Sequence, residues 1–155
     1  MTEPTAATAG SSVQIVCPHC LAANRVPVDR PAEKARCGAC KAALFDGHPV
    51  ALTEATFDRL VGRTEIPVVV DFWAPWCGPC RMMAPAFEQA AAQLEPQVRL
   101  VKVDTEANPG LAARYGIRSI PTLAVFSRGE ELTRQSGAMP LPQLLRWIEA
   151  ATAYA

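Results

Sequence analysis

The most constraining stretch of the sequence is an apolar run that leads directly into a Cys-x-x-Cys pair. Pro67 to Trp73 is rich in β-branched and aromatic residues and predicts a buried strand, and a helical pattern follows from Gly78 to about Leu94. The cysteines, Cys77 and Cys80, therefore lie where a strand turns into a helix. A buried strand followed by a helix predicts an α/β fold.

This position predicts redox chemistry for the pair. The N–H groups in the first turn of a helix lack intrahelical partners, and together with the helix dipole they stabilise negative charge. The thiolate of Cys77 is therefore favoured, and the thiolate is the nucleophilic form of cysteine. Cys80 lies one turn further on the same face, within reach of a disulfide. We expect Cys77 to be the nucleophile and Cys80 the resolving cysteine.

Composition limits the size of the domains and the kinds of partner. A chain of 155 residues, 50% of them hydrophobic, has room for one domain of roughly 100 to 110 residues and something smaller. Fifteen basic residues balance fifteen acidic ones, so we expect neither nucleic acid nor a membrane surface as partner. Residues 1–12 lack the features of a signal peptide, which predicts a disordered lead-in and a cytoplasmic protein.

All six cysteines fall into three Cys-x-x-Cys pairs, which in a reducing compartment indicates metal binding or redox work. Sixteen residues separate the first pair from the second, a spacing typical of zinc sites. A tetrahedral Zn²⁺ site is therefore predicted, with Gly38 easing its second turn. Its four thiolate ligands would be Cys17, Cys20, Cys37 and Cys40.

Residues 13–46 are predicted to form a small zinc ribbon with short strands at 13–16, 25–28 and 43–45. This segment of about thirty residues has few large apolar side chains and cannot build a sufficient core. The metal would therefore supply most of its folding free energy. Zinc could have a structural or a redox-regulatory role. Two disulfides, or iron in the same four-sulfur cage, are the alternatives.

Another alternative concerns the first pair alone. Cys17-Pro18-His19-Cys20 matches the active-site tetrapeptide of periplasmic disulfide oxidants, in which the thiolate is strongly stabilised. Pro27 and Pro31 follow where such a site needs a long helix. We therefore expect His19 to be a turn residue and not a ligand or a catalyst.

Residues 47–155 are predicted to form the larger domain, with the element order β-α-β-α-β-α-β-β-α. This order gives a mixed sheet with helices on both faces. Pro85 is expected to kink the helix that contains it. The predicted elements are strand 49–52, a helix capped by Thr53 and stopped by Gly62, strand 67–73, helix 78–94, strand 98–104, helix 108–115, hairpin strands 121–127 and 130–136, and helix 141–151.

The larger domain, from about Val50 to the C-terminus, resembles thioredoxin. Residues 76–80, Trp-Cys-Gly-Pro-Cys, are the active-site motif of that family. Further family signatures follow in the expected order at residues 70–74, 108–110, 115–118 and 120–122. With the four-cysteine segment ahead of it, the whole chain resembles the second, zinc-containing type of bacterial thioredoxin.

Two charged residues on the predicted strands have roles that the resemblance suggests. Asp71 interrupts an apolar strand; if it is buried, its pKa is raised and it serves as proton acceptor and donor for Cys80. A carboxylate turned out at the strand end is the alternative. Lys102 matches the family lysine that lies beside this aspartate and tunes it, whereas a surface lysine is the other interpretation.

The resemblance also implies a substrate groove. Ile120-Pro121 matches the cis-proline loop of the family, in which the backbone before the proline pairs with an extended segment of the substrate. Trp73 is expected to pack the domain instead of lining the groove. The expected substrate-binding residues are Trp76, Gly78, Pro79, Ile120, Pro121 and Gly137.

These features predict a protein-disulfide reductase that acts on oxidised client proteins by dithiol–disulfide exchange. The resemblance implies recharging by a thioredoxin reductase that draws on NADPH, with no organic cofactor bound to the chain, and a monomer is expected. Two other classes stay open. One is a disulfide oxidant or isomerase, although Gly-Pro between the cysteines lacks the histidine of those relatives; the other is a docking or redox-sensing module that depends on the zinc ribbon.

Overall fold

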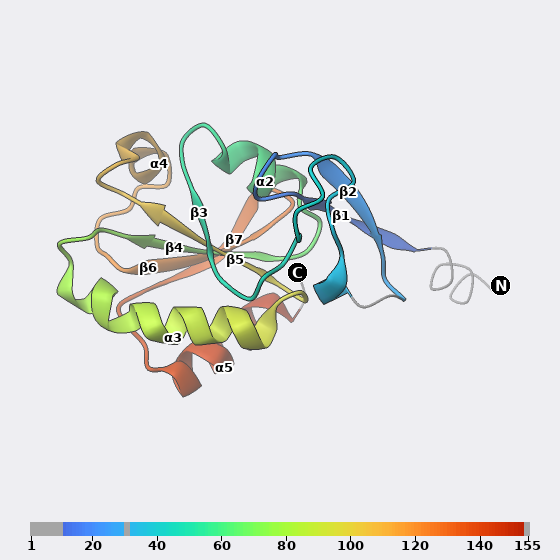
Figure 1. Ribbon diagram of the computed structural model, residues 1–155. Coiled ribbons are helices and arrows are strands. Elements are labelled where there is room, and N and C mark those ends of the chain that lie inside the picture. The colour runs from blue at the N-terminus through green and yellow to red at the C-terminus, as the bar shows by residue number, and fades with distance from the viewer. Residues whose placement is uncertain (1–10, 30–31, 154–155) are drawn as a thin grey trace.

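The structure is a computed structural model that describes residues 11–29, 32–153 and no others. Most of the predicted disordered lead-in, residues 1–10, lies outside the described residues. The prediction of disorder was wrong for Ser12, the last residue of this lead-in, because Ser12 begins the first strand. Figure 1 shows a small N-terminal ribbon at one end of a larger α/β domain.

A five-stranded mixed sheet forms the centre of the larger domain, in the order β3-β5-β4-β6-β7. β4 and β3 run parallel to β5, whereas β6 is antiparallel to both β4 and β7. β4 is the middle strand and is buried on both faces, as its continuous apolar run predicts. The strands are β3 (Val50–Leu52), β4 (Val68–Trp73), β5 (Arg99–Asp104), β6 (Thr122–Ser127) and β7 (Glu130–Ser136).

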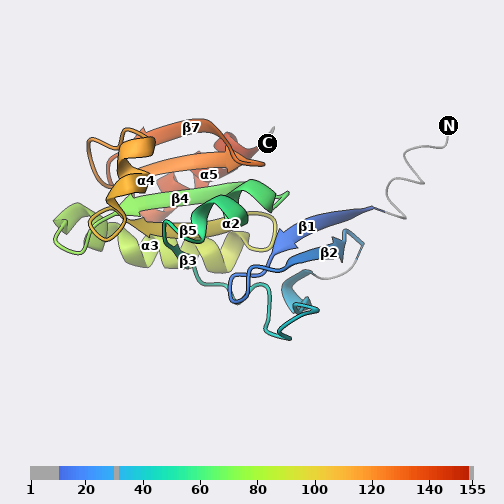
Figure 2. The same cartoon turned by 90° about the horizontal axis from the view of Figure 1, so that it is seen from above.

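Helices cover both faces of this sheet, as predicted (Figure 2). α3 (Gly78–Leu94) and α5 (Leu141–Thr152) pack on one face, and α2 (Phe57–Arg63) and α4 (Pro109–Arg114) pack on the other. Alternate residues of β4 point to opposite faces. Val69 accordingly joins the core cluster of α3 and α5.

The first helix of the larger domain differs from its prediction. α2 begins at Phe57, and Thr53 lies in a turn before it, where its hydroxyl accepts a hydrogen bond from the Ala55 N–H at 3.2 Å. Gly62 does not stop the helix, which ends one residue later at Arg63. Pro85 lies inside α3, which is continuous across it, so the kink stays a prediction.

The hairpin between β6 and β7 has the predicted turn. Arg128 and Gly129 have φ angles of 50° and 89°, and positive φ at both central residues is typical of the two-residue turns that suit twisted strands. β7 forms the edge of the sheet, and most of its side chains are exposed. No helix in the described part of the chain is both long and apolar enough to cross a membrane.

In its described residues, the ribbon contains one antiparallel pair of strands, β1 (Ser12–Val16) and β2 (Ala23–Pro27), and a short 3-10 helix, η1 (Ala32–Lys34). The third predicted strand, at 43–45, was wrong. Only an isolated bridge joins Arg36 to Ala43, because the second cysteine turn occupies most of the chain between these two residues.

The ribbon packs directly on the larger domain. The outer edge of β1 pairs with the chain between α2 and β4: the Glu65 N–H donates to the Gln14 carbonyl at 2.8 Å, and the Gln14 N–H donates to Glu65 Oε1 at 2.9 Å. Val16 of β1 is fully buried and belongs to the same core cluster as α2. The ribbon therefore lies at the end of the sheet where β4 begins, opposite the start of α3 (Figure 1).

Candidate active site and metal centre

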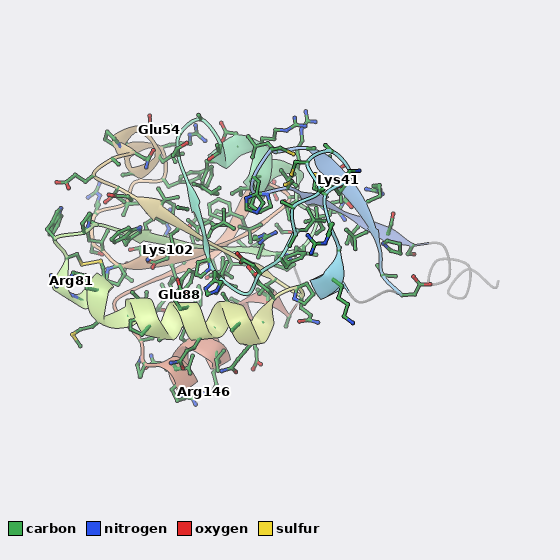
Figure 3. The ribbon with its side chains drawn as sticks, viewed as in Figure 1. Lys41, Glu54, Arg81, Glu88, Lys102 and Arg146 are labelled. Atoms are coloured by element: carbon green, nitrogen blue, oxygen red, sulfur yellow. A yellow bond between two sulfur atoms is a disulfide. The ribbon has the colours of Figure 1, made fainter. Side chains whose placement is uncertain are left out.

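The Cys77–Cys80 pair lies at the start of α3, at the end of the molecule where Arg81 is labelled in Figure 3. The two residues form a disulfide with a Cα–Cα distance of 5.3 Å. Cys77 caps the helix, and its sulfur accepts a hydrogen bond from the Cys80 N–H at 3.2 Å. Pro79 sits in the first turn, where its missing N–H has no intrahelical acceptor to lose. The end of β4 and the start of α3 thus hold both sulfurs at the helix N-terminus.

The predicted groove residues converge on this disulfide. The Ile120–Pro121 peptide bond is cis, and the Cys77 sulfur lies 3.7 Å from the Ile120 carbonyl oxygen. The Gly137 N–H donates to the Pro121 carbonyl at 2.9 Å, and Gly137 has a φ of 101°, which favours glycine. Trp76, beside the disulfide, leaves 66% of its surface exposed. Their role in binding substrate stays a prediction.

Asp71 is buried in the middle of β4, with 1% of its surface exposed. It alternates with Val70 and so shares the face of Val69, which packs against α3. Its Oδ1 atom has no hydrogen-bond partner among the described residues. Burial raises the pKa of Asp71 to about 7, and the charge of Lys102 opposes this rise. Asp71 is therefore a buried acid that can gain or lose a proton near neutral pH.

Lys102 lies opposite Asp71 in the register of β4 and β5. Its ammonium group lies 4.4 Å from the centroid of the Trp73 ring, a cation–π contact, and none of the ion pairs in the described part of the chain joins it to Asp71. Lys102 is half-buried, which disfavours the surface interpretation. Trp73 packs against the buried cluster of the two active-site cysteines.

Replacing Asp71 with alanine is expected to stabilise the oxidised protein at alkaline pH. The carboxyl of the unfolded chain ionises near its ordinary pKa of 3.8, whereas the buried one ionises only near 7. Ionisation therefore favours the unfolded state, and the free energy of unfolding of the wild type falls as pH rises between these values. Asp71→Ala should gain up to about 4 kcal/mol at pH 8, measured by urea unfolding.

The same measurement near pH 3 is the control. The carboxyl of Asp71 is then protonated in both the folded and the unfolded state, so the gain in stability should disappear. A gain of equal size at both pH values would contradict the buried-acid interpretation. Lys102→Gln tests it from the other side: the ammonium lowers the pKa of Asp71, so its removal should raise that pKa further. The carboxyl resonance of Asp71 followed by NMR would report the shift.

The second candidate site is built from two similar turns in the ribbon. In the first, the Leu21 N–H donates to the Cys17 carbonyl at 2.9 Å; in the second, the Lys41 N–H donates to the Cys37 carbonyl at the same distance. Leu21 and Lys41 have positive φ angles of 65° and 70°. The prediction that Gly38 eases the second turn was therefore wrong, because the left-handed residue follows the Cys-x-x-Cys unit instead of lying within it.

These turns bring four sulfur atoms together, all within 4.8 Å of one another. The sulfurs of the two pairs Cys17/Cys40 and Cys20/Cys37 are each 3.6 Å apart, close to the about 3.8 Å that tetrahedral bonds of ~2.3 Å to zinc would give. None of these four cysteines is in a disulfide, which disfavours the two-disulfide alternative. The set fits a tetrahedral metal ion, and zinc would supply folding free energy there.

His19 lies in the first turn, where its backbone N–H donates to the Cys17 sulfur at 3.3 Å. Its side chain is exposed and does not belong to the cluster of possible ligands. This agrees with the prediction of a turn residue.

Asn24 in β2 is a residue that the sequence did not reveal. Its Nδ2 atom donates to the Ala22 carbonyl at 3.1 Å and to the Cys37 sulfur at 3.5 Å, and its Oδ1 accepts from the Gly38 N–H at 2.8 Å. The Cys40 backbone and Asn24 lower the pKa of the Cys37 thiol to about 6. Asn24 thus ties the two cysteine turns together and favours the thiolate that a metal needs.

Asn24→Ala is expected to weaken metal retention by about 10- to 100-fold, the usual effect of losing a partner of a metal ligand. The rate at which a colorimetric chelator removes the metal measures this. Gln14→Ala is the matched control, because Gln14 lies on the paired strand but contacts the larger domain instead of a cysteine turn. Equal rates for wild type and Asn24→Ala would contradict the assigned role.

A buried arginine joins the ribbon to the sheet. Arg99 at the start of β5 is 1% exposed, donates to the Leu44 carbonyl and stacks 4.1 Å from the Phe45 ring centroid. Its partner is Glu95 at 3.5 Å, also buried. Burial raises the pKa of Glu95 to about 7 and lowers that of Arg99. This contact anchors the end of the ribbon beside the central sheet.

Comparisons with known proteins agree with this geometry. Residues 48–150 match the family model described as "Thioredoxin", and residues 16–42 match one described as "Thioredoxin 2, N-terminal". The chain is 45% identical over 135 residues to "Thioredoxin C-3" of Corynebacterium nephridii, covering 87% of this chain and 92% of that protein. It is 50% identical over 99 residues to "Thioredoxin 1" of Synechococcus elongatus, covering 64% of this chain and 92% of that one.

A solved structure is also similar, that of a mutant thioredoxin from Halobacterium salinarum NRC-1, with a TM-score of 0.62 at 31% identity. The match covers 70% of this chain and 94% of that one. A mixed sheet between two helical layers, with a Cys-Gly-Pro-Cys disulfide at the start of a helix, defines a protein with a thioredoxin fold and a redox-active pair. The chain belongs to the thioredoxin family, and it carries the N-terminal zinc-ribbon segment of the second type.

Proposed function

We propose that this protein is a disulfide reductase that transfers two electrons from Cys77 and Cys80 to a disulfide of a client protein. The disulfide at the N-terminus of α3, beside the cis-proline loop and the exposed Trp76, is the observation that carries the proposal. In the reduced protein, the first-turn N–H groups favour the thiolate of Cys77. The hydrogen bond that the Cys80 N–H donates to the Cys77 sulfur is one of these stabilising interactions.

The reaction has two exchange steps. The Cys77 thiolate attacks one client sulfur, the client S–S bond breaks, and the other client sulfur leaves as a thiolate that takes a proton. The Cys80 thiolate then attacks the Cys77 sulfur, which forms the Cys77–Cys80 disulfide and releases the second client thiol. The client gains two electrons, and this protein is oxidised.

Asp71 accepts the proton that Cys80 must lose before the second step. Its pKa of about 7 suits this role, because a base works best when its pKa is near the working pH. It points to the face of the sheet that α3 covers, and α3 carries the buried Cys80 in its first turn. Lys102 tunes Asp71 through its charge. The backbone around Ile120 and Gly137 would pair with an extended client segment.

The proposal extends to the partners, the metal and the compartment. A thioredoxin reductase that draws on NADPH would return two electrons to the disulfide, as the family implies. Residues 13–46 would form the zinc ribbon, with Cys17, Cys20, Cys37 and Cys40 as ligands, and residues 47–155 the thioredoxin domain. Six cysteines arranged in three Cys-x-x-Cys pairs favour a reducing compartment, the cytoplasm.

Insulin reduction tests this function. The purified protein, a bacterial thioredoxin reductase and NADPH are mixed with insulin, and NADPH consumption is followed together with the precipitation of the freed chains. Steady turnover that requires all components supports a reductase. Net disulfide formation in a reduced client, without turnover of insulin, would instead identify an oxidant.

A further inference from the structure

A hollow lined mainly by methionines lies beside the candidate active site. Its volume is about 290 Å³, and none of its lining residues is charged. This is slightly below the about 300–1,000 Å³ of most small-molecule sites, so a single side chain suits it better than a cofactor. The lining residues are Met82, Met83, Ala138, Met139 and Pro140. We call this hollow the methionine pocket.

Two chain segments connect the lining of the methionine pocket to the candidate active site. Met82 and Met83 follow Cys80 within the same helix, α3. On the other side, Ala138 follows Gly137, whose N–H donates to the carbonyl of cis-Pro121. A client polypeptide bonded to Cys77 would therefore extend past the edge of the pocket.

The pocket has a buried floor and an exposed rim. Met83 and Met139 are 2% and 5% exposed and belong to the core cluster between α3 and α5. Met82 is 79% exposed and forms the rim of the pocket. Val28, Trp76, Met82 and Leu132 are the large apolar residues exposed in the described part of the chain, and Trp76 and Met82 flank the Cys77–Cys80 pair in the sequence.

We propose that the methionine pocket binds one large apolar side chain, such as leucine, methionine or phenylalanine, that lies a few residues from the client cysteine attacked by Cys77. This inference rests on the proposed reductase function and adds a substrate preference to it. The mixed disulfide fixes the client against this surface, and burying an apolar side chain there removes it from water. Because methionine side chains are flexible and polarisable, the pocket can adapt to apolar side chains of different shape.

Synthetic peptide disulfides provide the test. In the parent substrate, a disulfide joins two copies of a peptide that has one cysteine in a background of glycine, serine and asparagine. Four derivatives carry, in each copy, a single leucine two or four residues before or after the cysteine. For the wild type, at least one leucine position is expected to raise kcat/KM by about fivefold over the parent, mainly through a lower KM. Met82→Gln should remove this gain and leave reduction of the parent unchanged.

Two further variants sharpen the comparison. Met82→Leu should keep the gain, because it preserves an apolar rim, whereas Leu132→Gln is a matched control on β7, away from the methionine pocket. The proposal is overturned if no leucine position increases kcat/KM, or if the gain survives in Met82→Gln. If the wild type reduces the parent peptide and the leucine peptides at the same kcat/KM, only the pocket proposal is contradicted. If it reduces neither the peptides nor insulin, the reductase function itself is contradicted.

Discussion

Replacing Cys77 with serine is expected to abolish client reduction, because a serine hydroxyl cannot form the mixed disulfide that begins the reaction. Replacing Cys80 with serine should have a different effect. The first step still occurs, but no resolving thiolate attacks Cys77, so the client stays bonded to the protein. Non-reducing gels of Cys80→Ser mixed with an oxidised client should show a covalent complex, and dithiothreitol should separate it by reducing the mixed disulfide.

The double variant, with serine at both positions, is the control for this experiment and should form no complex. Rates of alkylation add an independent measurement. In the reduced wild type, the Cys77 thiolate at the helix N-terminus should alkylate faster at neutral pH than a free cysteine, whose pKa is about 8.5. Complexes formed by Cys77→Ser, or turnover that survives in it, would contradict the assignment of the nucleophile.

Removal of the zinc ion that we propose for the four cysteines is expected to unfold the ribbon and to destabilise the contact between the ribbon and the larger domain. Zinc contributes about 10–16 kcal/mol in small structural sites, which is comparable to the whole stability of a domain. Cys37→Ser removes one ligand of the four-sulfur cluster. Hydrogen exchange should then show loss of protection at Gln14 and Glu65, whose amides pair the ribbon with the segment before β4.

The matched control is Cys80→Ser, which removes a sulfur at the other end of the molecule and should leave the metal content and this protection unchanged. Chelation of the wild type under reducing conditions should reproduce the effect of Cys37→Ser, and adding zinc back should reverse it. Full protection of Gln14 and Glu65 in a metal-free protein would show instead that packing alone holds the ribbon.

Local signals explain why much of the fold could be predicted. The apolar run of β4, the helical pattern of α3 and the Arg128-Gly129 turn are each encoded within a few neighbouring residues, and the structure has them as predicted. The spacing of the cysteines likewise predicted which four sulfurs would gather. The end of α2 was missed because Gly62 tolerates a helix interior, and no local feature there forces a positive φ.

Features that depend on distant parts of the chain could not be predicted. Asn24 resembles an ordinary polar strand residue until the turn at Gly38 is placed against it. Arg99 looks like a surface arginine in the sequence, and only the docked end of the ribbon, at Leu44, shows why it is buried. The methionine pocket needs α3 and the segment before α5 to meet across the fold.

The two groups of sulfur atoms lie at opposite ends of β4, since the ribbon pairs with residues just before this strand and Cys77 follows shortly after it. Six residues of strand span about 20 Å, whereas a disulfide needs Cα atoms within about 7 Å. Within one folded molecule, the distance between the two groups therefore excludes a disulfide between a ribbon cysteine and Cys77. Any such cross-linked species found after oxidative stress must join two molecules or come from chains in which the ribbon, or the whole molecule, has unfolded.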